Sequence, residues 1–200
     1  MFDRFLEKFI SKMEDAPKYE GFPCEEINEN INKHIGCAKI TSAVMVKLYY
    51  NDTIPEVKIC CADRGSTGDV KINADIVDEK LEINIETINT RFKGYVEIKL
   101  PKCENLTVIT TAEDVFMEGV DVEDIVVNTT SGDVSVVKAK FNKACVQSDY
   151  GDVSFDTEKV KYKLCLETDN GEIVKENVRS YSDAKKSITC KTKSGDIHIT

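Results

Sequence analysis

The stretch NTTSGDVSVV, residues 128–137, interrupts an apolar segment with Ser131, Gly132 and Asp133 and then resumes it at once. This interruption is too short to be a loop of its own. Variants recur downstream as QSDYGDVSF (147–155), ETDNGEIVK (167–175) and KTKSGDIHI (191–199). The recurrence predicts a repeated corner at which one short strand ends and another begins.

The corners recur at a nearly fixed interval. Glu113 takes the place of the glycine in one unit, and the anchor positions are then 94, 113, 132, 151, 171 and 195, at intervals of 19, 19, 19, 20 and 24 residues. The segment STGDVKI, residues 66–72, has the form of an earlier unit. Five units carry a hydroxyl residue three positions before the anchor: Thr110, Thr129, Ser148, Thr168 and Thr192. Lys175 replaces an apolar residue after Gly171, which predicts a distorted coil there.

A unit of this length cannot bury its own apolar face, whereas stacked copies can. We therefore expect a mainly β fold, a single-stranded parallel β-helix (solenoid) of about 19–20-residue coils with a short N-terminal helical cap. At each corner, glycine would supply a positive φ and the acidic residue would accept bonds from backbone N–H groups. Antiparallel hairpins with Gly-Asp turns are the competing arrangement, which the 19-residue register disfavours. The predicted core contains Leu106, Val108, Val127, Val134, Val136, Val146, Val153, Phe155, Leu166 and Ile197.

The N-terminal segment has a helical pattern instead. Its apolar stripe consists of Phe2, Phe5, Leu6, Phe9, Ile10 and Met13, and a second short helix is expected at 24–35. We assign residues 1–38 to a helical N-terminal cap and 39–200 to the β-solenoid repeat domain. The stripe either covers the open first coil or lies on a membrane surface, and balanced charges over residues 2–14 favour capping.

Composition excludes several classes of function. A net charge of −9 argues against nucleic-acid binding and against adsorption to anionic lipid. The sequence has no apolar run long enough to cross a bilayer, and the charged N-terminus lacks the apolar centre of a secretory signal. We therefore expect a cytoplasmic protein with no direct membrane insertion.

Eight cysteines occur without a C-x-x-C pair and with only two histidines, so zinc-ligand spacing is missing. Reduced, buried thiols are the expected state. Cys145 and Cys165 occupy equivalent positions of units that follow one another in sequence and should point outward, one above the other. This arrangement suggests an oxidant-sensitive pair as a weaker hypothesis.

The acidic corner residues Asp133, Asp152, Glu172 and Asp196 should also stack, which makes them a weak candidate cation ladder for calcium. Turn capping is the favoured interpretation. His34 and His198 have no motif-defined nucleophile, and no cluster of carboxylates with Arg or Lys is apparent on one face. We predict no catalytic residue, no cofactor and no enzymatic activity.

The segments DIVVNTTSGDVSVV, NKACVQSDYGDVSF and KKSITCKTKSGDIHI resemble the putative-adhesin β-strand-repeat family of bacteria, also called toastrack-type domains. The resemblance covers roughly residues 57–200 and rests on the signature T-x-S-G-D-φ-x-φ. It implies a single-stranded β-helix without assigned activity. It also implies a sensory or scaffolding module, since relatives occur beside membrane helices in envelope-stress sensing systems.

The predicted function is a non-catalytic scaffold or interaction module that binds a protein or glycan, linked by the resemblance to envelope sensing or adhesion. The alternative is a carbohydrate-active enzyme or glycan-binding protein that uses a solenoid face. The chain ends at Thr200, directly after the last unit, so its terminal coil would expose unpaired backbone groups. The polar insert ENVRSYSDAKKS, residues 176–187, could cover them, but a homodimer through the C-terminal coil is favoured.

Overall fold

The computed structural model describes residues 26–27, 35–52, 55–61, 69–89, 92, 94–157 and 160–200, which are almost entirely β-strand. Sheet A has nine strands in the order β1 (Glu26–Ile27), β4 (Glu56–Cys61), β7 (Gly94–Leu100), β3 (Met45–Tyr50), β9 (Val115–Glu118), β11 (Val134–Val137), β13 (Val153–Asp156), β17 (Ile197–Ile199) and β15 (Ile173–Lys175). Sheet B has eight in the order β14 (Tyr162–Asn170), β16 (Lys186–Ser194), β12 (Lys143–Tyr150), β10 (Val122–Thr129), β8 (Cys103–Thr110), β2 (Cys37–Ser42), β6 (Lys80–Thr87) and β5 (Val70–Val77). No helix in this described part is long and apolar enough to cross a membrane.

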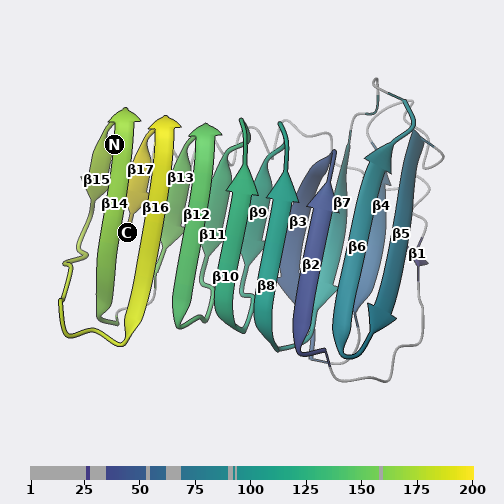
Figure 1. Ribbon diagram of the computed structural model, residues 1–200, viewed down its shortest axis with the longest axis horizontal. Helices are drawn as coiled ribbons and strands as arrows, with labels where there is room; N and C mark the ends of the chain where they lie inside the picture. The colour runs from purple at the N-terminus through teal and green to yellow at the C-terminus, as the bar shows by residue number, and fades with distance from the viewer. Residues whose placement is uncertain are drawn as a thin grey trace.

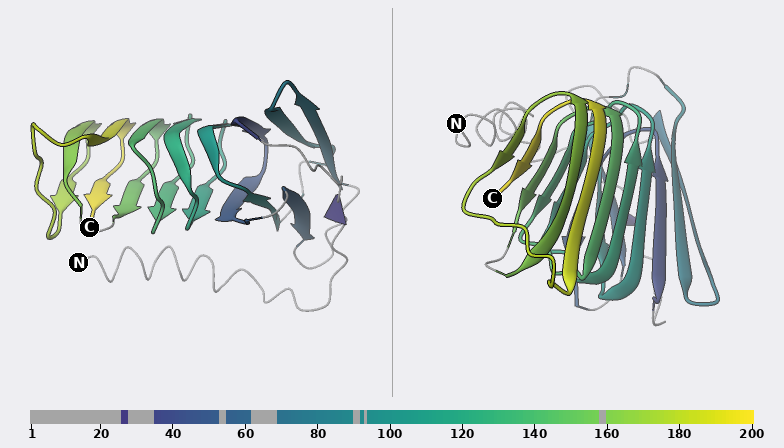
Figure 2. Two further views of the ribbon diagram at one scale, coloured as in Figure 1. Left: turned by 90° about the horizontal axis from the view of Figure 1, so that it is seen from below. Right: turned by 60° about the vertical axis from the view of Figure 1, so that its left-hand side comes forward.

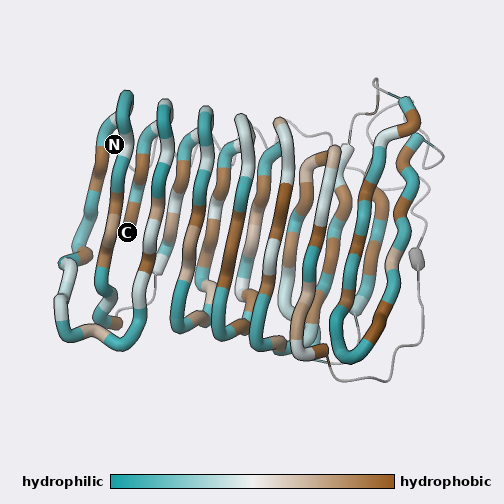
Figure 3. Tube along the Cα trace, viewed as in Figure 1, coloured by the Kyte–Doolittle hydropathy of each residue, from teal (hydrophilic) through white to brown (hydrophobic). Residues whose placement is uncertain are grey.

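The two sheets lie face to face, and the chain passes from one to the other at each corner (Figures 1 and 2). Apolar and polar residues alternate along most strands, so one side of each sheet is apolar (Figure 3). These apolar sides meet in one continuous core. All the predicted core residues except Leu166 are buried, and Leu166 is only partly buried because β14 is an edge strand.

The repeat units stack in parallel, as the 19-residue interval predicted. Ile125 pairs with Ala144 between β10 and β12, and Val134 pairs with Val153 between β11 and β13. Both pairs are 19 residues apart, and both pairings are parallel across the corner at Gly132. The antiparallel hairpin arrangement is therefore excluded for this part of the chain.

The order of the coils departs from the order of the sequence at both ends. At the C-terminal end, β16 and β17 lie between the coil of β12 and β13 and the coil of β14 and β15. At the other end, β2 and β3 lie between the coil of β6 and β7 and the coil of β8 and β9. Both inserted coils are therefore paired on two sides, and the last coil of the sequence is not the last coil in space.

This order corrects the expectation of an uncovered C-terminal coil, because the end coil is formed by β14 and β15. The polar insert contacts the start of that edge. The Tyr181 N–H donates to the Tyr162 carbonyl at 2.9 Å, and the Leu164 N–H donates to Ser180 Oγ at 3.0 Å. The homodimer remains a prediction, but the free terminal coil on which it was based does not exist.

The N-terminal end of the stack is antiparallel. β5 and β6 form a hairpin whose turn residues Asp78 and Glu79 have φ values of 50° and 63°. β4 also pairs antiparallel with β7 and with β1. The interpretation of STGDVKI as a coil corner is wrong, because Val70 begins the edge strand β5 instead.

The helical cap predicted for residues 1–38 falls mostly on residues 1–25 and 28–34, which lie outside the described residues. Two parts of that segment differ from the expectation. Glu26 and Ile27 form strand β1 instead of the first turn of a helix, pairing with Val57 and Lys58. The strand pattern also begins at Cys37, two residues before the predicted boundary at 39.

Candidate functional site

The acidic corner residues form a ladder that links successive coils. Asp114 Oδ1 accepts the Asp133 N–H at 2.8 Å, and Asp133 Oδ1 accepts the Asp152 N–H at 2.9 Å. Asp152 Oδ1 then accepts the Asp196 N–H at 2.8 Å, and Asp196 Oδ1 accepts the Glu172 N–H at 2.7 Å. Each of these four Asp carboxylates thus accepts a hydrogen bond from a backbone N–H at the corner of the neighbouring coil. This is the capping role expected for these residues.

The candidate cation residues Asp133, Asp152, Glu172 and Asp196 do line up at this edge, but Asp196 lies between Asp152 and Glu172. Three of their carboxylates are engaged with backbone donors. Among the residues that the structure describes, no group of three or more His, Cys, Asp or Glu side chains is placed to hold a metal ion. The geometry supports capping, and the calcium hypothesis gains no support from it.

The corner glycines are required by close packing between coils. A Cβ on Gly132 would lie 2.0 Å from the Glu113 carbonyl oxygen, and a Cβ on Gly151 would lie 2.4 Å from that of Gly132. The expected reason, a positive φ, is wrong for these two residues, since the described glycines with positive φ are Gly119 and Gly195. The backbones approach so closely at this corner that a side chain has no room.

The hydroxyl residues three positions before the corners form a second, inner ladder. Four of the five predicted hydroxyl residues, Thr110, Thr129, Ser148 and Thr192, are buried on adjacent strands of sheet B, and Ser42 of β2 continues their row. The fifth, Thr168, lies on the edge strand β14 and is only partly buried. The Gly132 N–H donates to Thr129 Oγ1 at 3.0 Å, and Thr110 Oγ1 donates to the Glu113 carbonyl at 3.0 Å. Ser42 Oγ and Thr192 Oγ1 also bond backbone carbonyls, so the role of these four hydroxyls is structural. The buried Ser148 Oγ has no hydrogen-bond partner among the described residues.

The cysteine pair is not stacked. Thr189 of β16 pairs with Cys145 on one side and with Cys165 on the other. The two cysteines are therefore separated by two strand spacings, about 9.6 Å, which is beyond disulfide reach. Both side chains are exposed and point outward as expected, but the hypothesis of an oxidant-sensitive pair within one chain is wrong.

Of the two histidines, His34 lies outside the described residues. His198 is at the middle of β17, pointing outward from sheet A as the alternation predicted. It is nevertheless buried, with 7% of its surface exposed. The sequence predicted no nucleophile for His198. Its neighbour in register on β13 is Ser154.

A buried cation occupies the outer side of sheet A near its N-terminal edge. Lys47 Nζ lies 3.8 Å from the centroid of the Tyr95 ring, a cation–π contact. Burial lowers the pKa of Lys47, opposed by the nearby Cys60 and Glu97. Burial, with Glu97 as a lesser cause, also raises the pKa of Tyr49 to about 12. Lys47 and Tyr49 are thus held in a desolvated environment.

The outer face of sheet B carries many solvent-exposed side chains. Its outward residues include Lys39, Glu82, Cys145, Gln147 and Cys165, all solvent-exposed, from strands that pair in register. Ion pairs cross between strands on this face. Lys191 Nζ lies 2.9 Å from Glu167 Oε1, and Lys193 Nζ lies 2.8 Å from Asp149 Oδ1. The surface is mostly polar and of mixed charge. Its interior strands are hydrogen-bonded to a strand on each side.

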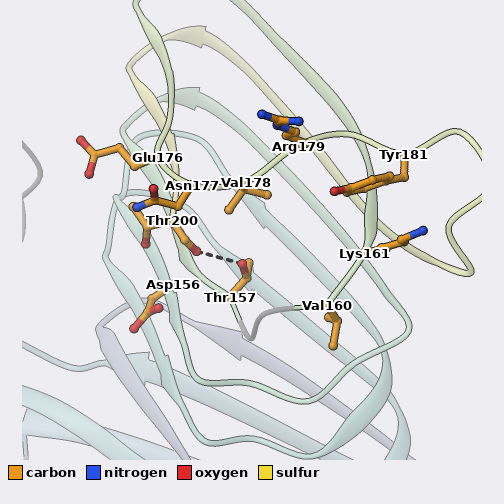
Figure 4. A pocket seen from close by; sticks show the side chains of 10 residues that line it. All are labelled: Asp156, Thr157, Val160, Lys161, Glu176, Asn177, Val178, Arg179, Tyr181 and Thr200. Carbon is orange, nitrogen blue, oxygen red and sulfur yellow. Dashed lines mark hydrogen bonds between the residues drawn. The ribbon is translucent and has the colours of Figure 1, made fainter.

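A groove of about 500 Å³ lies where β13, β15 and β17 end and the polar insert begins (Figure 4). Its lining includes the acidic Asp156 and Glu176, the basic Lys161 and Arg179, and Tyr181, with Lys161 Nζ 4.9 Å from the Tyr181 ring centroid. Thr157 Oγ1 donates to the Thr200 carbonyl at 2.8 Å across its floor. This volume is within the range of small-molecule sites.

A family model confirms what the corner repeat suggested. The Toastrack DUF4097 model matches residues 53–200. The chain belongs to the Toastrack DUF4097 family. The match covers most of the chain and contains the whole series of corners from Gly94 to Gly195.

One of two similar solved structures shares the fold of this chain. A putative cell adhesion protein from Clostridium sporogenes is 13% identical, with a TM-score of 0.69 over 88% of this chain and 98% of that one. A putative adhesin from Parabacteroides distasonis is 11% identical, with a TM-score of 0.37 over 88% and 96%. At these identities the likeness of the first shows the fold alone, and that of the second carries no argument. No curated protein matches the chain.

Within this Toastrack chain, the sequence reasoning missed the end groove. It noted the long 24-residue interval before Gly195 but treated the insert only as a lid. The signal was present in the composition of that insert, since Glu176, Arg179 and Tyr181 combine both charges with an aromatic ring. The cluster of carboxylates and basic groups that the sequence did not reveal is formed when this insert meets Asp156 and Lys161.

Proposed function

We propose that this Toastrack protein is a non-catalytic interaction module that binds a protein partner through the outer face of sheet B. The observation that carries the proposal is the extent of that face: eight strands, mostly of eight or nine residues, present outward side chains that are mostly polar and mostly exposed or half-buried. Adhesion and envelope sensing are the settings that the sequence resemblance implies for such a module.

The size of the face suits a stable interface. Seven strand spacings and eight residues per strand give a surface of about 34 Å by 27 Å. A standard protein–protein interface buries roughly 800 Å² on each partner, which this face can supply. Because interior strands are bonded on both sides, the surface is rigid before binding, and little conformational entropy is lost on association.

Site-specific photocrosslinking in the native host tests the proposal. A photoreactive residue at Gln147, exposed at the middle of the face, should give one discrete protein adduct. The matched control is a photoreactive residue at Lys138, which is equally exposed but lies in the corner after β11. The Lys138 position should give no such adduct.

Purification of the adduct and its reconstitution with the pure protein complete the test. The charge-reversal variant Lys39→Glu, on the same face, should weaken the reconstituted complex at least about tenfold, since mismatched charges oppose association. Equal adducts from Gln147 and Lys138, or a complex insensitive to Lys39→Glu and Glu82→Lys together, would contradict the proposal.

The end groove favours a second candidate, a small polar ligand such as a glycan unit. Tyr181 offers a ring for stacking, and the groove supplies both hydrogen-bond donors and acceptors around it. Nuclear magnetic resonance titration with simple saccharides should then shift Tyr181 and Asn177 signals, and Tyr181→Ala should abolish the shifts. A hydrolytic activity on such a ligand remains the untested alternative.

A further inference from the structure

Strand β5 is the last strand of sheet B, at the opposite end from β14 (Figure 1), and it pairs only with β6. The register of this pairing is fixed, since the Ile88 N–H donates to the Asp69 carbonyl at 2.8 Å. Along an antiparallel pair, successive residues alternate between bonding the neighbouring strand and facing away from it. The odd-numbered residues of β5 therefore bond β6. The residues whose N–H and C=O groups point to the outer edge are Val70, Ile72, Ala74 and Ile76.

This outer edge of β5 has no hydrogen-bond partner among the residues that the structure describes. The opposite edge of the sheet is partly occupied. There the Tyr181 N–H donates to the Tyr162 carbonyl, and the Leu164 N–H donates to Ser180 Oγ. An open row of backbone groups on an edge strand is a template for a further strand. β5, which is eight residues long, offers such a row along its whole length.

The side chains of β5 decide which strand fits there. On the outer face of the sheet, Lys71, Asn73 and Asp75 are all exposed. On the inner face, Ile72 and its neighbours in the row pack against the core but are only partly buried. An added strand would cover this inner apolar row, and its own outer side chains would stand directly beside the charged ones. The charge pattern is therefore what selects the partner.

The charge pattern is complementary to itself. Lys71 and Asp75 have opposite charges and lie two residues on either side of Asn73. If two antiparallel copies of β5 meet at a two-fold axis through Asn73, each Lys71 stands opposite Asp75 of the other copy. On the inner face, Ile72 then stands opposite Ala74 of the other copy. Opposite charges directly across an antiparallel pair stabilise it, whereas like charges destabilise it.

Other two-fold registers lack this match. The backbone requires even-numbered residues opposite even-numbered ones, so the axis must pass through a residue position. Moving the axis by one position places Lys71 opposite Asn73 or opposite Val77. Moving it by two positions places Lys71 opposite its own copy, or Asp75 opposite its own copy. Only the axis at Asn73 pairs each lysine with an aspartate.

We propose that a second copy of this chain docks on β5 by antiparallel pairing of the two β5 strands about Asn73. The unpaired backbone groups of both edges are then bonded. The interface uses the same surface on both copies, so the assembly closes as a dimer and leaves no edge for a third copy. Sheet B continues from one copy into the other, with both outer faces on the same side. The dimer lies at the opposite end from the C-terminal coil, and it does not depend on the partner binding proposed above.

Charge exchange tests the register. Sedimentation equilibrium of the full chain should show a reversible equilibrium between monomer and dimer. Lys71→Asp creates two like-charge contacts with Asp75 in each dimer and should raise the dissociation constant at least about tenfold. The double variant Lys71→Asp/Asp75→Lys restores opposite charges, and its dissociation constant should return to within about threefold of the original. The control Lys163→Asp changes an exposed lysine of β14 and should leave the dissociation constant unchanged.

A thiol at the two-fold axis gives a second readout. The proposed pairing places the Cα atoms of the two Asn73 residues about 4.5 Å apart, which is within disulfide range. Mild oxidation of Asn73→Cys should therefore yield a covalent dimer whose peptide map shows a bridge between the two positions 73. The matched control is Asn84→Cys, because Asn84 is equally exposed and is the partner of Asn73 on β6. Its two copies would be three strand spacings apart, about 14 Å, so no bridge between them is expected.

Three results would overturn the proposal. The first is a chain that stays monomeric at every concentration measured. The second is a dimer that Lys163→Asp weakens and Lys71→Asp does not, which would place the interface at the β14 edge. The third is equal bridging in Asn73→Cys and Asn84→Cys, which would show collision of exposed thiols without strand pairing. The cysteine variants keep the test decisive if a charge variant fails to fold.

Discussion

The Asp196 N–H donates to Asp152 Oδ1 at 2.8 Å although 44 residues separate the two in sequence. This bond continues the ladder in which Asp133 Oδ1 accepts the Asp152 N–H. Glu172 comes before Asp196 in the sequence, but in the ladder it follows Asp196. The last coil therefore completes contacts on both of its sides. Its pairing joins the end coil of β14 and β15 to the rest of the stack.

Removal of one ladder carboxylate should destabilise the fold measurably. Asp152→Ala leaves the part-buried Asp196 N–H without its acceptor, at an expected cost of about 1–2 kcal/mol in the free energy of unfolding. Urea denaturation measures it, with Asp169→Ala, an exposed acidic residue of β14, as the control. Equal losses in the two variants would show that the ladder bond contributes nothing.

A methyl group at the corner should be more damaging. In Gly151→Ala, the new Cβ would lie 2.4 Å from the Gly132 carbonyl oxygen, so the coils must separate at this point. Overpacking of this kind costs about 1–3 kcal/mol. Gly36→Ala is the control, because its Cβ would meet nothing closer than 3.8 Å. Thermal unfolding of the two variants should therefore differ clearly, and similar midpoints would contradict the close-packing explanation.

The sequence was sufficient to predict the strand register in the middle of the stack. Between β8 and β13 the corners recur every 19 residues, and each position therefore has one partner on the next coil. The carboxylate ladder followed from the same pattern, because Asp133 and Asp152 each hold the same place in a unit.

The order of the coils at the ends was not predictable from this pattern. Every unit presents the same alternation, so Val153 can pair as well with Ile197 as with Ile173. The longer interval before Gly195 gives the chain the extra length to pass over one coil, but interval length alone does not say that it does so. The groove depends on this path, so its lining could not be assembled from the sequence.

The cysteine arrangement leads to a prediction about oxidation. Mild peroxide should form no disulfide between Cys145 and Cys165, because Thr189 lies between them. The variant Thr189→Cys places a thiol one strand spacing, about 4.8 Å, from each, which is within bridging range. Intact mass and peptide mapping should find a bridge only in that variant. A Cys145–Cys165 bridge within a monomer of the unaltered chain would contradict the strand order.

Glu113 should make stability depend on pH. Burial, with Asp114 as a lesser cause, raises the pKa of Glu113 in the folded state. The folded state therefore favours protonated Glu113. The stability that this protonation contributes is fully present below the pKa of Glu113 in the unfolded chain, and it is lost as pH rises through the pKa of Glu113 in the folded protein. Glu113→Gln should stabilise the protein relative to the unaltered chain at neutral pH, and this difference should shrink as pH falls. Urea midpoints measured over that range test the sign, and a constant difference would contradict it.

A proline in the last coil should distinguish internal pairing from a role in association. Ile197→Pro deletes the N–H that donates to the Glu172 carbonyl at 2.8 Å, and β17 has strand neighbours on both sides. We therefore expect the monomer itself to lose about 1–3 kcal/mol of stability.

Ile173→Pro in the edge strand β15 is the control, and it should cost less because an edge strand tolerates a missing donor on its free side. Urea denaturation gives the loss, and light scattering gives the association state of each variant. A variant at Ile197 that keeps full monomer stability but dissociates a dimer would restore the terminal coil as an interface and contradict its internal position.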